Sequence, residues 1–111
     1  MRIEIRGRNT AVPDGLRQHV EERFTNRIGK QVSDLAYLHV DLLEEHREHV
    51  AEATLQLKGI TLRAREGSSD LMHSVDLVAD KLARQVKRHR EKRRGRRDPN
   101  VRAASPPPES A

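Results

Sequence analysis

The densest chemical feature of this chain is a run of basic side chains near its C-terminus. Between Lys81 and Arg97 the sequence has ten lysines and arginines against a single acid, Glu91. Residues 1–80 hold 11 lysines and arginines against 14 acids, so the positive charge of the chain is concentrated at one end. Such a field favours a polyanionic partner more strongly than uniform basicity would. Nucleic acid is the leading class of partner, and an anionic membrane surface comes second.

Four of these cations share one stripe if the run is helical. At about 100° per residue, roughly a fifth of the helix circumference holds Lys81, Arg84, Arg88 and Lys92. The apolar stripe that includes Leu82 and Val86 lies about a quarter-turn or more away, so its burial would leave the basic stripe exposed. Like charges four residues apart destabilise a helix. Helix faces that serve only solubility therefore usually combine positive and negative side chains. The pattern therefore favours polyanion binding over simple solubility.

The kind of polyanion follows partly from the scarcity of aromatic residues. Phe24 and Tyr37 are the only aromatics, and Phe24 falls on a predicted apolar helix stripe. Single-strand binders and RNA-recognition sheets stack bases on aromatic platforms, which this chain lacks. We therefore expect recognition of structured RNA through its phosphates and shape, with strong salt dependence. A membrane-binding helix would also need apolar anchors beyond those committed to the core.

Other residues that could do chemistry form weaker patterns. The absence of cysteine excludes thiolate metal sites and cysteine nucleophiles. His46 and His49 have a ligand-like spacing in a predicted hairpin loop, but no third ligand is defined. Glycine-rich phosphate loops, paired-carboxylate motifs and nucleophile elbows are absent. We expect no enzymatic activity, no metal or cofactor, and no small-molecule substrate.

Several polar residues have structural interpretations. Ser68-Ser69-Asp70 is typical of a helix cap, and His39 and Asp41 are expected to make surface contacts along a strand. Asp76 and Asp80, on the flank of the C-terminal helix, are expected to pair with Arg84 or, less favoured, to meet RNA-bound cations. Four arginines of the predicted strands point to the sheet face that is turned away from the core. They either extend the positive surface of the protein or only keep that sheet face solvated; they are Arg2, Arg6, Arg63 and Arg65.

The periodicities predict the elements that must position the basic stripe. Apolar alternation predicts strands over 2–6, 36–42, 51–57 and 60–65, and four-residue spacing predicts helices over 13–29 and from residue 70 to about 93. Charged or glycine-containing loops are expected over 44–48 and 66–69, with a tight turn at 58–59.

The element order is β-α-β-β-β-α, an α+β fold with a four-stranded sheet and two helices packed on one face. The last three strands should form an antiparallel meander, whereas the edge on which the first strand pairs stays open. One domain over 1–97 and a disordered proline-rich tail over 98–111 are expected. The N-terminus offers no apolar run for a signal peptide or membrane helix, so a cytoplasmic location is the default.

Three segments resemble the family of ribosome hibernation-promoting factors and ribosome-associated inhibitor A. Its first strand and helix are similar to residues 3–9 (IEIRGRN) with Val12 and Leu16, and its third strand is similar to 51–55 (AEATL). Its second helix is similar to 70–76 (DLMHSVD) and 80–92 (DKLARQVKRHREK), the most specific match. The resemblance covers about residues 1–93.

This resemblance implies a fold similar to double-stranded-RNA-binding domains. It implies binding to the small ribosomal subunit and its ribosomal RNA, in the channel for messenger and transfer RNA, so that idle ribosomes are silenced under stress. The residues implied to face that RNA are Lys81, Arg84, Arg88, Arg90 and Lys92, with Lys87 at a position where the family varies. Off the ribosome the protein is expected to be monomeric. The alternative is a general structured-RNA or duplex-binding protein without ribosome specificity.

The sequence also departs from the family pattern. Met72 stands where the family usually has tyrosine, and His73 stands where it has alanine. Longer members carry a second domain that pairs two ribosomes, so this chain resembles a short form or part of a long one.

Overall fold

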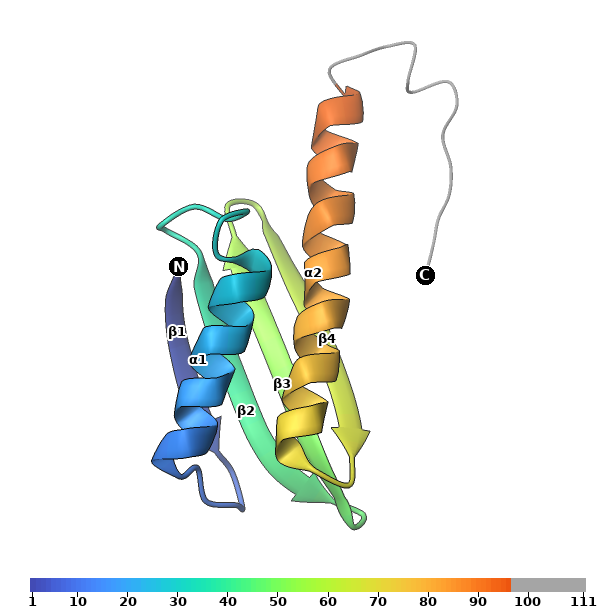
Figure 1. Cartoon of the computed structure of the whole chain (residues 1–111). Coiled ribbons are helices and arrows are strands. Elements are labelled where there is room, and N and C mark those ends of the chain that lie inside the picture. Colours follow the sequence, from blue (N-terminus) through green and yellow to red (C-terminus); the bar gives the residue numbers. More distant parts are fainter. Residues whose placement is uncertain (97–111) are drawn as a thin grey trace.

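The computed structural model describes residues 1–96, with side chains described as far as residue 92. Figure 1 shows the elements, which are β1 Arg2–Gly7, α1 Asp14–Ile28, β2 Tyr37–Glu45, β3 Glu48–Leu57, β4 Ile60–Ser68 and α2 Leu71–Arg96. The predicted α+β class and the order β-α-β-β-β-α are confirmed. The tail predicted over 98–111 lies outside the described residues.

The four strands form one sheet in the order β1-β2-β3-β4. β2, β3 and β4 pair antiparallel, which confirms the predicted meander. β1 runs parallel to β2, with Arg2 opposite Tyr37 and Arg6 opposite Asp41. A parallel pair needs a long crossover connection, and α1 supplies it. This pairing settles the edge that periodicity left open, and it makes β1 and β4 the two edge strands.

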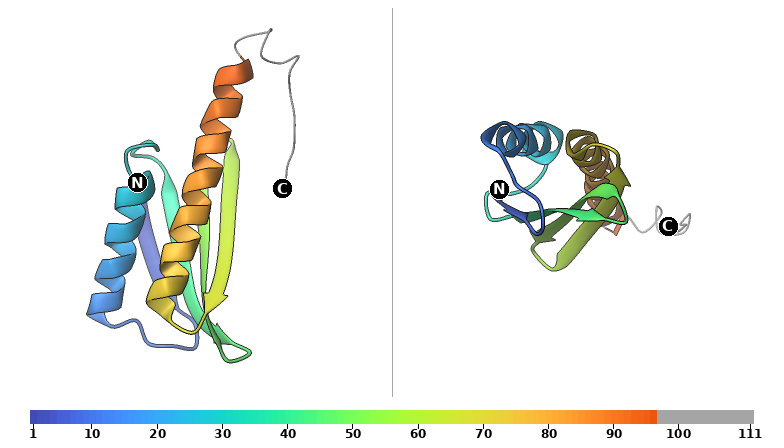
Figure 2. Two further views of the ribbon diagram at one scale, coloured as in Figure 1. Left: turned by 45° about the vertical axis from the view of Figure 1, so that its right-hand side comes forward. Right: turned by 90° about the horizontal axis from the view of Figure 1, so that it is seen from below.

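Both helices cover the same face of the sheet, and α2 lies over β3 and β4 (Figure 2). α1 buries the residues that the four-residue spacing predicted, Leu16, Val20, Phe24 and Ile28. Phe24 is fully buried, so the prediction that it belongs to the core is confirmed. The sheet contributes alternate residues such as Leu38, Val40 and Leu55 to the same core. The opposite face of the sheet carries mostly polar side chains, with Leu43 and Val50 as buried apolar exceptions.

The β2–β3 hairpin is tighter than the sequence predicted. Residues 44–48 were expected to form a loop, but the strands continue to Glu45 and resume at Glu48. Only His46 and Arg47 form the turn, with φ angles of 52° and 66°. Two left-handed residues match the twist of antiparallel strands, so the hairpin can close in two positions despite lacking glycine.

Two further boundaries differ from the predictions. The loop expected over 66–69 is wrong, because β4 continues to Ser68, which pairs with His49 of β3. α2 reaches Arg96, beyond the last position with apolar support in the sequence. Lysine, arginine and glutamate have high intrinsic helix propensity, which sustains a helix without a core face. As a result, α2 projects well past the sheet (Figure 1).

Candidate nucleic-acid interface

The apolar stripe of α2 fixes which side of this helix meets solvent. Val75, Val78, Ala79 and Leu82 are fully buried, and Val86 is the last buried residue of the helix as far as residue 92. This confirms the predicted core stripe. Burial of five side chains on one side leaves α2 no rotational freedom, so the cations on its other sides have fixed directions.

Hydrogen bonds at the start of α2 also hold it in place. A carboxylate oxygen of Asp70 accepts the backbone N–H of His73 at 3.3 Å, which confirms the predicted helix cap. The fully buried hydroxyl of Ser74 donates to the carbonyl of His49 on β3 at 2.6 Å. It also lies 2.7 Å from the hydroxyl of Ser68 on β4. Ser74 therefore ties α2 to both strands beneath it.

Two acids of α2, Asp76 and Asp80, are turned toward α1. One carboxylate oxygen of Asp76 lies 2.8 Å from both Arg23 Nε and His19 Nε2, and Asp80 lies 2.6 Å from Arg27 Nη2. The ion-pair interpretation of these aspartates is confirmed, but Arg84 as their partner is wrong. α1 packs alongside α2 and brings its own basic side chains closer than a neighbour on the same helix. The other flank of α2 is consequently left with cations.

Those cations form one wall of a groove beside the edge strand β4. The groove has a volume of about 400 Å³ and is lined by Ile60 and Leu62 of β4 and by Lys81, Arg84, Gln85, Arg88, His89 and Lys92 of α2. All four members of the predicted basic stripe are therefore brought together. We call this feature the α2–β4 groove.

Within the groove the four cations differ in their pairing. Lys81 Nζ lies 3.0 Å from Glu66 Oε2 on β4, which partly neutralises it. Arg84, Arg88 and Lys92 are exposed and make no ion pair or hydrogen bond with the part of the chain that the structure describes. Their charge is therefore available to a partner.

The two remaining predicted residues lie elsewhere on α2. Lys87 is exposed and does not line the groove. Arg90 donates to Gln31 Oε1 at 3.4 Å, on the side where α1 ends. The structure thus places Arg90 away from the basic stripe, as the helical projection indicates.

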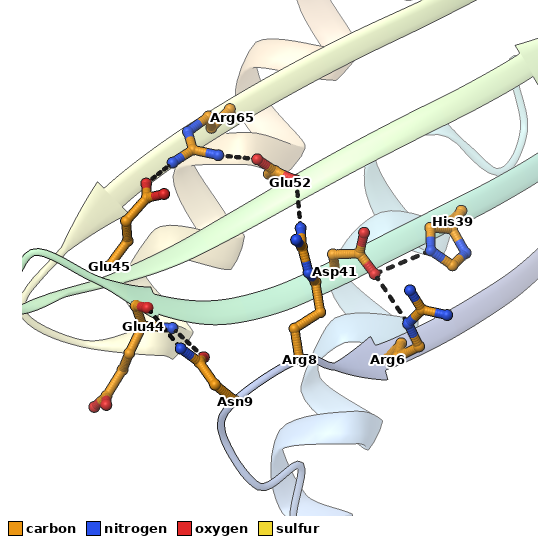
Figure 3. A network of polar contacts seen from close by, with 9 residues as sticks. All are labelled: Arg6, Arg8, Asn9, His39, Asp41, Glu44, Glu45, Glu52 and Arg65. Atoms are coloured by element: carbon orange, nitrogen blue, oxygen red, sulfur yellow. Dashed lines mark hydrogen bonds and ion pairs between the residues drawn. The ribbon is translucent and has the colours of Figure 1, made fainter.

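The open face of the sheet neutralises most of its own charge (Figure 3). Arg6 lies 3.8 Å from Asp41, and Arg8 lies 3.7 Å from Glu52. Arg65 bridges Glu52 and Glu45. Arg6 and Arg65 therefore solvate and cross-link this face and do not extend the positive surface. Arg63 is exposed and lines a shallow hollow next to Lys81.

A smaller polar cluster occupies the β1 edge of the open face. His39 Nε2 lies 3.0 Å from Asp41, which confirms the predicted strand contact. The hydroxyl of Tyr37 donates to Glu4, and this hydrogen bond is the main reason why the pKa of Glu4 lies below 4.5. The same bond raises the pKa of Tyr37 above 10.0. The cluster stabilises the β1–β2 pair.

The histidine hairpin does not assemble a metal site within the described residues. His46 is exposed at the turn, and His49 Nδ1 lies 3.4 Å from Glu44 Oε2. In residues 1–96 there is no group of three or more histidine, aspartate or glutamate side chains placed to hold a metal ion. No helix in this range is long and apolar enough to cross a membrane.

Four residues that line the groove were missed by sequence reasoning: Ile60, Leu62, Gln85 and His89. Ile60 and Leu62 were assigned only to a strand, and Gln85 was not singled out, although it donates to the carbonyl of Arg63 at 2.7 Å. Alternation along β4 shows that Ile60 and Leu62 face the helix side. It does not show that α2 leaves a gap above them, because helix placement over a sheet is a tertiary property.

Comparisons with known proteins agree with this geometry. A family model described as sigma 54 modulation protein / S30EA ribosomal protein matches residues 3–94. A ribosome hibernation promoting factor of Azotobacter vinelandii is 33% identical over 108 residues, which cover 97% of this chain and 100% of that protein. A ribosome hibernation promotion factor of Picosynechococcus is 34% identical over 103 residues, or 87% of this chain and 53% of that protein.

The chain therefore spans about half the length of the longer relatives that it matches. Among solved structures, the N-terminal domain of Protein Y from Thermus thermophilus superimposes with a TM-score of 0.71 at 30% identity. The match covers 80% of this chain and 99% of that domain.

Proposed function

The chain belongs to the sigma 54 modulation protein / S30EA ribosomal protein family, and from this premise we propose that it is a ribosome hibernation factor. It binds the small ribosomal subunit in the channel for messenger and transfer RNA and silences idle ribosomes under stress. It acts in the cytoplasm and without catalysis. The support is twofold: relatives at 33–34% identity carry the name of hibernation factor, and the basic residues of α2 are presented to solvent.

The observation that carries this proposal is the row of unpaired cations on the wall of the α2–β4 groove. Arg84, Arg88 and Lys92 point away from the core and face no acid among residues 1–92. Phosphates of ribosomal RNA would neutralise them, and release of condensed counterions would supply affinity. Inhibition would then follow from steric exclusion of messenger and transfer RNA, since no bond has to be made or broken.

Cosedimentation with purified ribosomes tests the proposal. The protein should travel with small subunits and whole ribosomes at low salt and be released at high salt. The triple variant Arg84→Glu, Arg88→Glu, Lys92→Glu should stay at the top of the gradient.

The control variant Arg17→Glu, Lys30→Glu, Lys58→Glu changes the net charge equally at three exposed sites outside the groove. It should still sediment with ribosomes. Unimpaired sedimentation of the groove variant, or equal loss in both variants, would contradict an RNA-facing groove.

A general structured-RNA binder is the second candidate, because phosphate contacts from a helix carry no sequence information by themselves. Competition separates the two functions. Free duplex RNA should displace a general binder from ribosomes at equal phosphate concentration. A hibernation factor should be displaced only at a large excess of duplex.

A further inference from the structure

The floor of the α2–β4 groove is apolar, although its helix wall is basic. Ile60 and Leu62 line it from β4 and are both only partly buried. Leu62 packs against the core cluster, whereas Ile60 is not among the hydrophobic residues that do so. Ile60 therefore faces the groove without serving the core. A site that bound only phosphate would gain nothing from such a floor.

From this combination we infer that the α2–β4 groove takes one unpaired nucleotide of RNA. Its base would lie against Ile60 and Leu62, and its flanking phosphates would meet Arg84 and Arg88. The inference rests on the proposed function, because it specifies how the RNA-facing side of α2 recognises its target. It also revises the sequence-based hypothesis that the absence of aromatic platforms leaves phosphate contacts alone.

The dimensions of the groove favour a single nucleotide over a duplex. Its volume of about 400 Å³ lies near the lower end for small-ligand sites, which run from about 300 to 1,000 Å³. The phosphates of a duplex lie on its convex outer surface, so they could reach the cations of α2 while leaving the floor empty. Unpaired nucleotides in loops and bulges can be splayed out, and they expose a flat base joined to phosphate.

The walls suit this ligand as well. Three of the four cations are unpaired among the described residues, and arginine guanidinium groups can stack on bases as well as bind phosphate. Gln85 is anchored through its hydrogen bond to the Arg63 carbonyl, which holds one wall in a fixed position against the edge of β4. A preorganised wall lowers the cost of ordering side chains on binding.

Three RNA hairpins with matched phosphates test the inference by fluorescence anisotropy at fixed ionic strength. One is fully paired, one carries a single bulged uridine, and one carries an abasic nucleotide at the bulge. The protein should bind the uridine bulge about fivefold more tightly than the abasic bulge. Equal affinity for these two hairpins would overturn the inference.

Two variants test whether Ile60 causes the preference for the uridine bulge over the abasic bulge. Ile60→Thr keeps a β-branched residue in β4 and removes the apolar contact. The ratio of the affinities for the uridine and abasic bulges should therefore fall to about one, while the affinity for the abasic hairpin stays unchanged. Ile3→Thr makes the same change in β1, on the opposite edge, and should keep the fivefold ratio. A ratio preserved in Ile60→Thr would overturn the inference, as would one lost equally in both variants.

A crosslink on the wild-type protein gives an answer independent of variant stability. 4-Thiouridine at the bulge should crosslink to peptides spanning 59–63 or 84–92, whereas crosslinks confined to the open sheet face would contradict the site. Polyglutamate is added as a competitor that mimics an acidic protein partner. If polyglutamate displaces bulged RNA at a lower concentration than single-stranded RNA does, the groove prefers an acidic protein and the inference is overturned.

Failure of the inference and failure of the proposed function are distinguishable. If the protein cosediments with ribosomes but binds the uridine and abasic bulges equally well, the proposed hibernation function is supported and the nucleotide site is contradicted. Selective bulge binding without ribosome cosedimentation does the reverse.

Discussion

At the scale of single residues, the candidate interface is defined by which cations lack an acid. Lys81, Arg84 and Arg88 share one stripe of α2, but among the residues with described side chains only Lys81 has an acidic partner, Glu66 on β4. Sequence spacing predicted the stripe, because it follows from the helix period alone. It could not predict the pairing, because Glu66 lies 15 residues away and reaches Lys81 only through the packing of α2 on β4.

The pairing of Lys81 leads to a prediction for Glu66→Gln. The substitution frees the ammonium group of Lys81 and removes one negative charge beside the groove, so affinity for structured RNA should rise about two- to fivefold at low salt. Filter binding measures it. Glu21→Gln, an equal charge change on the exposed side of α1, should alter affinity far less, and an equal gain in both would show that only net charge matters.

A second residue-scale prediction concerns Tyr37→Phe. The Tyr37 hydroxyl lowers the pKa of Glu4, so this bond stabilises the fold above pH 4.5 and the stabilisation is lost as pH falls below that value. The pKa of Tyr37 is raised, so its contribution is present below pH 10.0 and is lost as pH rises further. In Tyr37→Phe, the pKa of Glu4 followed by NMR should rise toward 4.5. An unchanged Glu4 titration would contradict this assignment.

At the scale of elements, α2 matters because it is fixed on the sheet at one end and projects from it at the other. Its first half is held by the buried stripe, by Ser74 and by the ion pairs with α1. Beyond Val86 it carries no buried residue among those with described side chains. This division lets the first half fix the direction of the helix and leaves the second half exposed for the proposed partner.

Ser74→Ala tests how firmly the first half is held. The change removes the hydroxyl donor from the part-buried His49 carbonyl, which should lower the free energy of unfolding by about 1–2 kcal/mol. Urea denaturation followed by circular dichroism measures it. Ser69→Ala, at an exposed neighbouring position, should change stability by less than about 0.5 kcal/mol. Equal effects of the two substitutions would contradict the anchoring role of Ser74.

At the scale of the whole molecule, charge is sorted onto two surfaces. The open face of the sheet pairs arginines such as Arg6 and Arg65 with nearby acids, as Figure 3 shows. The aspartates of α2 are paired with α1, which leaves the groove side of α2 positive. Within the described part of the chain, the groove side of α2 would therefore be an attractive surface for an approaching polyanion.

This sorting predicts the salt dependence of ribosome binding. If the six cations Lys81, Arg84, Lys87, Arg88, Arg90 and Lys92 all meet phosphate, the slope of log K against log salt should be about −4 to −5. If only Arg84, Arg88 and Lys92 do so, the slope should be about −2 to −3. Gradient sedimentation over a range of salt concentrations distinguishes the two. A slope near zero would contradict electrostatic binding altogether.

The sequence by itself determined the elements, their order, the core stripes and the basic stripe. Each of these follows from a local period of 2 or 3.6 residues, which can be read along the chain. The predictions from sequence were wrong at positions where no local periodicity determines the structure. The His46-Arg47 turn closes without glycine, and β4 continues to Ser68 because β3 offers it a partner.

Only the tertiary structure decided where β1 pairs, which acids neutralise which bases, and what lies beneath the basic stripe. These depend on contacts between residues far apart in sequence, such as Lys81 with Glu66 and Asp80 with Arg27. The apolar floor at Ile60 and Leu62 belongs to the same class, because it becomes a groove only when α2 packs beside β4. The cations are set by the sequence, and the site that they form is set by packing.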